Sequence, residues 1–82
     1  MEQIARTPAQ IGATLRRFRR LSGLTQSELG EKAALRQATI SSIERGEPAV
    51  QLQTLADVLA ALGLELVIRS RTKHTARIED LL

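Results

Sequence analysis

Apolar residues recur every three or four positions in four short segments of this 82-residue chain, and this repeat constrains the fold more than any other feature. Such spacing is typical of helices that bury one face against a neighbour. The chain carries a single aromatic residue, Phe18, so the core has to be built from Leu, Ile, Val and Ala. We therefore predict one small domain of packed helices. The residues expected on the buried faces are Ile11, Leu15, Phe18, Leu29, Ala33, Ile40, Ile43, Leu52, Leu55, Val58, Leu59 and Leu62.

Capping signals place the ends of these helices. In the stretch TPAQ we expect Thr7 as an N-cap, Pro8 at the first helical position and Gln10 closing a capping box. The stretch TQSE at 25–28 forms a second box. The predicted helices are one after Thr7 that ends before Gly23, one from the second box to a tight connection at 33–36, one that ends at Gly46, and one from about Leu52 to Leu62.

The period changes after Gly63. In the stretch LELVIR (64–69), Leu64, Leu66 and Ile68 alternate with other residues, which predicts a β-strand with these three on its buried side. The backbone groups of a strand need a partner, and no second strand is predicted in the chain. We divide the chain into an N-terminal arm (1–6), a folded domain (7–69) and a C-terminal tail (70–82).

The composition argues against several classes of function. The chain has no cysteine and a single histidine, His74, so we expect neither a disulfide nor a metal site. No nucleophile–base pair and no Gly-rich phosphate loop is evident, and we expect no enzyme, cofactor or small-molecule substrate. No apolar run approaches the roughly 20 residues that span a bilayer. The N-terminus also lacks the apolar region of a signal peptide, so we expect a cytoplasmic protein without a membrane partner.

The charge is positive and unevenly distributed. The formal net charge is +3 and the sequence pI is about 10.6. Basic residues gather in RRFRR (16–20) and in RSRTKHTAR (69–77). Two such clusters are compatible with a polyanionic partner.

The stretch QATISSIERG (37–46) predicts a helix with an unusual outer face. Ile40 and Ile43 share the buried side, whereas the opposite side carries hydroxyls, an alanine and an amide in place of the usual Glu and Lys. With the residues before it, this stretch forms LTQSELGEKAALRQATISSIERG (24–46), which resembles the helix-turn-helix of phage-repressor and Cro type, the XRE-like regulators. The resemblance covers roughly residues 10–64. It implies a repressor that binds double-stranded DNA sequence-specifically, at a palindromic operator.

The resemblance also assigns roles to residues of the motif. In this family the helix after the turn lies in the major groove, and short side chains let its backbone approach the base edges. The implied base contacts are Arg36, Gln37, Ala38, Ser41 and Ser42, and the implied backbone contacts are Gln26, Ser27, Thr39 and Arg45. A merely solvated polar face is the alternative. For Arg36, reading a guanine, contacting a phosphate and plain surface exposure all stay open.

The basic run at 16–20 divides into two parts. In the resembling repressors, the Arg at the place of Arg19 pairs with the Glu near the end of the recognition helix. The resemblance therefore implies a structural ion pair between Arg19 and Glu44. Arg16, Arg17 and Arg20 are predicted to be exposed, and a solvated face, a protein contact and a phosphate contact stay open for them.

The layout of the whole chain resembles one subfamily more closely. Four helices followed directly by a short hydrophobic strand are similar to the HipB-type antitoxins, in which each subunit gives one strand to a sheet across the dimer. The resemblance implies a mostly α fold, in which a four-helix phage-repressor-like domain precedes one strand that pairs across a homodimer. Residues 7–69 would then be the DNA-binding and dimerisation domain. The implied dimerisation residues are Leu64, Leu66, Val67 and Ile68.

This subfamily also implies a protein partner. The chain would be the antitoxin of a HipBA-type toxin–antitoxin module, repressing its own operon and neutralising a HipA-type kinase toxin. In the tail, Ile78, Leu81 and Leu82 are expected as apolar anchors for such a partner. A free-standing phage-type or restriction-control regulator without a toxin is the alternative.

Overall fold

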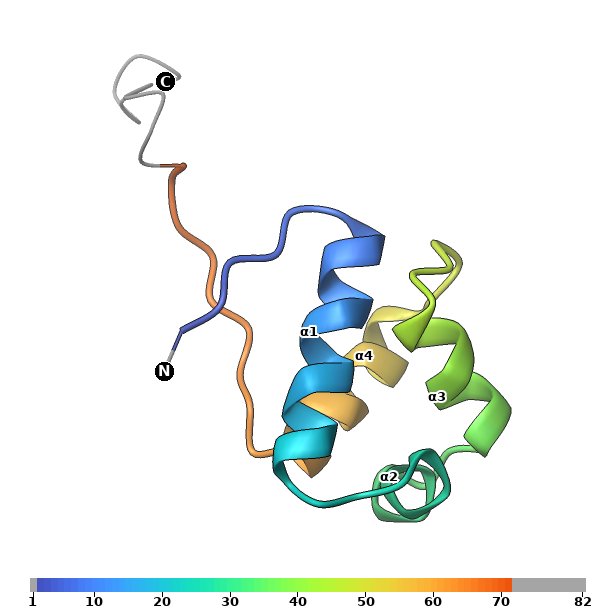
Figure 1. The fold of residues 1–82 in the computed structure, drawn as a ribbon. Coiled ribbons are helices and arrows are strands. Elements are labelled where there is room, and N and C mark those ends of the chain that lie inside the picture. Colours follow the sequence, from blue (N-terminus) through green and yellow to red (C-terminus); the bar gives the residue numbers. More distant parts are fainter. Residues whose placement is uncertain (1, 72–82) are drawn as a thin grey trace.

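A computed structural model describes residues 2–71 and contains four helices (Figure 1). They are α1 (Pro8–Leu21), α2 (Gln26–Ala33), α3 (Gln37–Glu44) and α4 (Leu52–Ala61). The prediction of a mostly α, four-helix domain is confirmed. The expectations for Ile78, Leu81 and Leu82 lie outside the described residues. Within residues 2–71, no helix has the length and apolar character needed to cross a membrane.

The helix starts follow the predicted caps, with one difference. Thr25 and Glu28 form the complete capping box of α2, in which each side chain accepts the backbone N–H of the other residue, at 3.0 and 2.8 Å. At α1, the Thr7 hydroxyl accepts the N–H of Gln10 at 3.1 Å. The side-chain oxygen of Gln10, however, accepts the backbone N–H of Arg6 at 2.7 Å. In a standard capping box it would accept the N–H of the N-cap residue, Thr7. Gln10 therefore ties the end of the N-terminal arm to α1.

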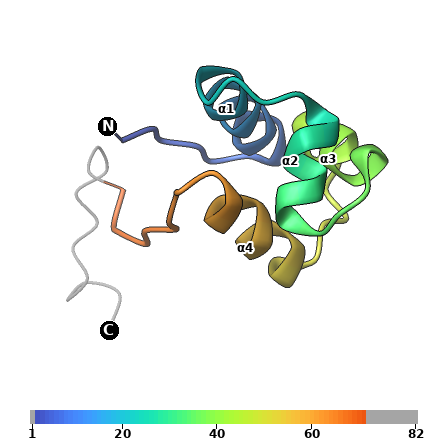
Figure 2. The same ribbon diagram turned by 90° about the horizontal axis from the view of Figure 1, so that it is seen from below.

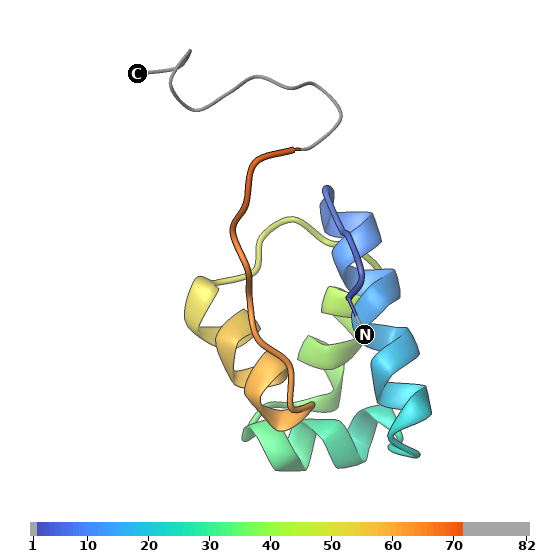
Figure 3. The ribbon, with the colours of Figure 1, turned by 90° about the vertical axis from the view of Figure 1, so that its left-hand side faces the viewer.

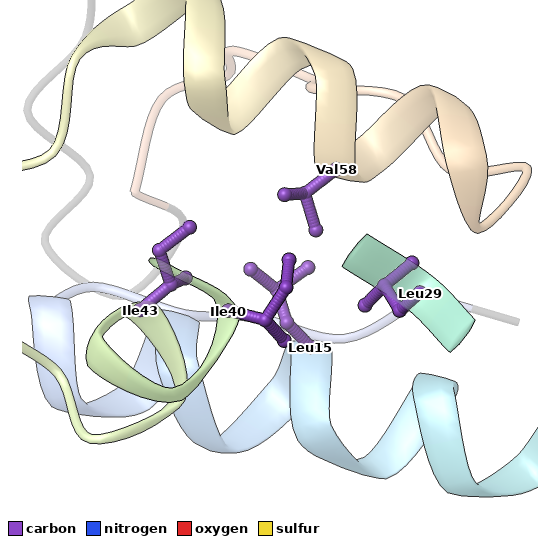
Figure 4. Packing of buried hydrophobic residues seen from close by; sticks show 5 residues of the cluster. All are labelled: Leu15, Leu29, Ile40, Ile43 and Val58. Atoms are coloured by element: carbon purple, nitrogen blue, oxygen red, sulfur yellow. The ribbon is translucent and has the colours of Figure 1, made fainter. Parts of the chain in front are cut away.

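The core is built by residues from all four helices. Leu15 of α1, Leu29 of α2, Ile40 and Ile43 of α3, and Val58 of α4 point toward one another and are buried (Figure 4). The α1 and α4 helices lie on opposite sides of α3, and α2 closes the base of the domain (Figure 3). The predicted buried faces of α2 and α3 are confirmed.

Two residues expected in the core are more exposed than predicted. Phe18 is only half-buried, and Leu52, the first residue of α4, is 80% exposed. Helical spacing identifies which side of a helix faces inward, but it does not show how far the neighbouring helices extend along it. Conversely Ala61, which was not among the residues expected on the buried face, is partly buried and packs against the core.

The turn between α2 and α3 depends on an unusual backbone conformation. Ala34 has φ 58° and ψ 43°, a left-handed conformation that costs an L-residue roughly 1–2 kcal/mol. The N–H of Leu35 then donates to the carbonyl of Gly30 at 2.7 Å, which ends α2. This turn sets α3 across α2, as the view from below shows (Figure 2). This left-handed residue could not be predicted, because the sequence ALR after Ala33 contains no glycine.

The predicted strand at 64–69 is absent from the single chain. Residues 64–71 have no regular secondary structure and run away from the helices (Figure 1). Leu64 packs against the core, but Leu66 is 67% exposed and Ile68 is 91% exposed, so the prediction that all three pack on this chain's helices is wrong. The physical reason is that a lone segment finds no backbone partner within residues 2–71, as strand formation requires. An exposed ion pair of 3.3 Å joins Arg69 to Glu2 of the arm.

Gly12 allows α1 and α3 to approach closely. A Cβ atom at this position would lie 2.3 Å from the carbonyl oxygen of Ile43 and 2.8 Å from that of Glu44. Both atoms belong to the backbone, so neither can move without shifting the end of α3.

We predict that Gly12→Ala destabilises the fold by about 1–3 kcal/mol, the usual cost of overpacking, although alanine favours helices. Urea unfolding followed by circular dichroism measures the change. Ala13→Ser, which adds one atom at an exposed position of the same helix, should change the free energy of unfolding by much less. Equal stability of Gly12→Ala and the unmodified chain would contradict the close approach.

Candidate nucleic-acid interface

The outer face of α3 presents the residues expected to read bases. Gln37 and Ala38 are exposed, as is Arg36 immediately before the helix. Thr39, Ser41 and Ser42 are half-buried, while Ile40 and Ile43 fix the opposite side in the core (Figure 4). Arg36 occupies the N-cap of α3 without a side-chain cap, because a guanidinium donates hydrogen bonds and cannot accept a backbone N–H.

A chain of side-chain hydrogen bonds connects the two helices of the motif. The Gln37 amide donates to the Gln26 carbonyl oxygen at 3.3 Å, and the Gln26 amide donates to Glu44 Oε1 at 3.1 Å. Gln26 is therefore held from both ends of α3 and orients Gln37. This link was not predicted, because neither the spacing nor the composition of the motif shows which amide reaches which.

The first turn of α2 offers backbone donors. The first N–H groups of a helix have no partner within it. The Thr25 hydroxyl accepts the N–H of Glu28, and the Thr25 backbone carbonyl accepts the N–H of Leu29, at 3.0 Å each. The N–H groups of Gln26 and Ser27 precede them at the positive end of the helix dipole, an arrangement that favours a phosphate.

The side chain of Arg45, the residue after α3, makes its contacts with neighbouring residues at the end of this helix. Its guanidinium donates to the hydroxyls of Ser41 and Ser42 and forms a 2.8 Å ion pair with Glu47. The hydrogen bond from Arg45 holds the pKa of the Glu47 carboxyl below its usual value. Glu47 was missed in the sequence, although a carboxylate two residues after an arginine is a visible signal. In this state Arg45 orients the two hydroxyls of the recognition helix.

Ser42 lies one helical turn after Ala38, at the border of the outer face of α3. It borders a hollow of about 330 Å³ between α3, the connection that follows it, and α4. The lining residues are Thr39, Ser42, Ile43, Glu47, Ala49, Val50, Gln51 and Thr54. Thr39 and Ser42 thus form one edge of the motif, while Gln37 and Ala38 lie on its exposed front.

Arg19 and Glu44 form a buried ion pair between α1 and α3. Arg19 Nε lies 2.6 Å from Glu44 Oε2 and Arg19 Nη2 lies 3.1 Å from Oε1, while Nη1 donates to the Leu24 carbonyl at 2.8 Å. The side chains are only 10% and 4% exposed. The pair therefore fastens the end of the recognition helix to α1 and to the connection before α2.

The protonation states of this pair follow from its contacts. Burial acts to raise the pKa of Glu44, but the hydrogen bonds from Arg19 and Gln26 and the charges of Arg19 and Arg16 outweigh it, so the pKa lies below its usual value. The hydrogen bond to Glu44 raises the pKa of Arg19. Both groups are charged at neutral pH, and each satisfies the other. Within residues 2–71, no group of three or more His, Cys, Asp or Glu residues is placed to hold a metal ion.

We predict that Glu44→Gln and Arg19→Met each cost about 3–5 kcal/mol, because each leaves one buried charge unpaired. The double variant should recover part of this loss, which a double-mutant cycle from urea unfolding measures. Single losses that simply add would show that the pair contributes no coupling energy.

Comparison with known proteins identifies the family of this fold. Residues 15–68 match the helix-turn-helix family model. The chain is 31% identical over 78 residues to "Antitoxin HipB" of Escherichia coli O6:H1 (strain CFT073), with 92% of this chain and 83% of that protein covered. It is 34% identical over 62 residues to "Antitoxin HipB" of Escherichia coli (strain K12), with 76% and 70% covered.

Solved structures agree with the sequence relatives. A "HipB-O4 20mer complex" superposes with a TM-score of 0.78 at 32% identity, covering 84% of this chain and 97% of that one. The "Structure of HipA-HipB-O2-O3 complex" gives 0.77 at 33% identity, with 88% and 100% covered. The restriction-modification controller protein C.AhdI from Aeromonas hydrophila gives 0.67 at 29% identity, with 71% and 88% covered. This chain belongs to the HipB-type antitoxins of the XRE-like helix-turn-helix family of DNA-binding regulators.

Proposed function

We propose that this protein is an operator-binding repressor that reads DNA with the exposed front of α3. The observation that carries the proposal is the position of Gln37, which is exposed at the start of α3 and held by Gln26 at 3.3 Å. A glutamine amide can bond adenine bidentately in the major groove, and Ala38 beside it is short enough to contact a thymine methyl. Arg36, Ser41 and Ser42 complete the proposed base contacts.

The proposed backbone contacts surround this face. Gln26 and Ser27 offer main-chain donors at the start of α2, Thr39 lies on α3, and Arg45 follows its last residue. Arg45 has to leave Glu47 or share its guanidinium to contact a phosphate. Two such motifs in a homodimer would meet half-sites of a palindrome about one helical turn, or a multiple of it, apart.

We assign the dimer contact to segment 64–69. Leu66, Val67 and Ile68 are among the most exposed large apolar residues within 2–71, and an unpaired extended backbone favours pairing with another chain. The same segment from a second copy supplies both the hydrogen bonds and the apolar cover that this chain lacks.

We also propose a HipA-type kinase toxin as a protein partner. A similar HipB chain was solved in a complex named "HipA-HipB-O2-O3". The outer side of α4, where the Gln53 amide donates to Asp57 at 2.9 Å, lies outside the proposed DNA face. The likeness to a restriction-modification controller supports the second candidate, a regulator without a toxin.

Gln37→Ala should relax base preference at one position of each half-site, since a bidentate contact contributes about 1–3 kcal/mol of discrimination. Binding across an operator variant library measures this. Gln53→Ala removes the same atoms from an exposed position on α4 and should leave the preference unchanged. If both variants retain the full preference, α3 does not read DNA through Gln37.

Leu66→Lys should weaken the dimer more than Val67→Lys, because alternation in an extended segment puts Leu66 on the same side as Leu64, which packs against the core, and Val67 on the other side. Sedimentation equilibrium measures the dissociation constants. Equal dimerisation of both variants and the unmodified chain would remove segment 64–69 from the interface.

Co-expression with the product of the neighbouring gene should yield a stable complex that still binds operator DNA. Size-exclusion chromatography with and without a duplex from the region upstream of the coding sequence tests this. Normal DNA binding with no protein complex would support the regulator without a toxin.

A further inference from the structure

The helix-turn-helix segment carries no net positive charge. Residues 24–47 contain three cations and four carboxylates, namely Lys32, Arg36 and Arg45 against Glu28, Glu31, Glu44 and Glu47. Arg45 is also paired with Glu47. Because DNA affinity comes largely from neutralising phosphates with Lys and Arg, cations elsewhere in the domain would strengthen binding.

A basic hollow lies beside the motif. It has a volume of about 430 Å³ and opens between α1 and the end of α3. Its lining consists of Ala13, Arg16, Arg17, Arg20 and Leu21 of α1 together with Glu44. Residues 16, 17, 20 and 21 are spaced along one side of α1, so three guanidinium groups gather around one cavity.

The charge of this hollow is only partly compensated by the residues that the structure describes. Glu44 is its only carboxylate, and both of its oxygens already accept hydrogen bonds from Arg19 and Gln26. Within residues 2–71, Arg16, Arg17 and Arg20 form no ion pair with another side chain. The three arginines therefore present free positive charge to an outside partner.

A chain of hydrogen bonds connects the lining of the hollow to the proposed DNA face. Glu44 lines it and also accepts the amide of Gln26, the first residue of α2. Gln26 in turn accepts the amide of Gln37 on the recognition helix. One carboxylate thus separates the arginine cluster from the residues that would contact the operator.

We propose that Arg16, Arg17 and Arg20 bind the DNA phosphate backbone beside each half-site, extending the interface from α2 onto α1. This rests on the proposed operator binding. The contact carries no base information, because phosphates are the same in every sequence. An acidic protein surface is the alternative occupant, and DNA is favoured because the helix-turn-helix segment has three cations against four carboxylates, while phosphate binding draws on Lys and Arg.

The test measures affinity as a function of salt for a double variant, Arg16→Gln with Arg20→Gln. The probes are a duplex from the region upstream of the coding sequence and a random-sequence duplex of the same length. Each lost contact should lower the slope of log K against log salt by roughly 0.9 and weaken binding roughly fivefold at physiological salt, on both probes alike. Arg16→Lys with Arg20→Lys keeps the charge and should keep most of the slope.

Arg6→Gln with Arg71→Gln removes the same two charges from exposed positions outside the hollow and serves as the control. If the double Gln variant has the slope of this control while the unmodified chain binds the upstream duplex, the inference is overturned and operator binding stands. Loss of binding to an acidic partner protein with an unchanged DNA slope also overturns it. If the unmodified chain does not prefer the upstream duplex, the proposed function itself fails.

Discussion

The buried ion pair between Arg19 and Glu44 connects the parts of this domain that have to stay in register. Arg19 reaches Glu44 with two nitrogens and the Leu24 carbonyl with a third. Glu44 then accepts a hydrogen bond from the side-chain amide of Gln26, and the Gln26 side-chain oxygen accepts one from Gln37 and so orients it. A charge network with no unsatisfied buried side-chain atom among the described residues thus runs from α1 to the exposed front of α3. The recognition helix is positioned from its C-terminal end as well as by its core face.

Most of the fold could be predicted from the sequence because it follows from local patterns. Helical spacing gave the buried stripe of Ile40 and Ile43, and the TQSE box gave the start of α2. The left-handed Ala34 and the close approach at Gly12 could not be predicted, because both depend on how two helices meet. The strand at 64–69 failed for a different reason, since alternation shows a segment that can pair but does not supply its partner.

The candidate site was predictable in its residue types more than in its contacts. The motif indicated which side of α3 is exposed, and Gln37 and Ala38 lie there. It did not show that Arg45 is bound by Glu47 or that Gln26 joins Glu44 to Gln37. The motif also does not show that a cluster of three arginines lies on α1, whereas residues 24–47 carry three cations and four carboxylates. Specificity and affinity reside on different helices if α3 reads bases while α1 holds phosphates.

The central claim is that the exposed front of α3, oriented by the network of Gln26 and Glu44, meets the operator. Nuclear magnetic resonance of the ¹⁵N-labelled chain, titrated with the duplex from upstream of its coding sequence, tests this directly. The account predicts that the side-chain amides of Gln26 and Gln37 and the backbone amides at 37–41 shift together, whereas the side-chain amide of Gln53 on α4 does not. Shifts confined to α4 or to residues 64–71, with the side-chain amides of Gln26 and Gln37 unchanged, would contradict it.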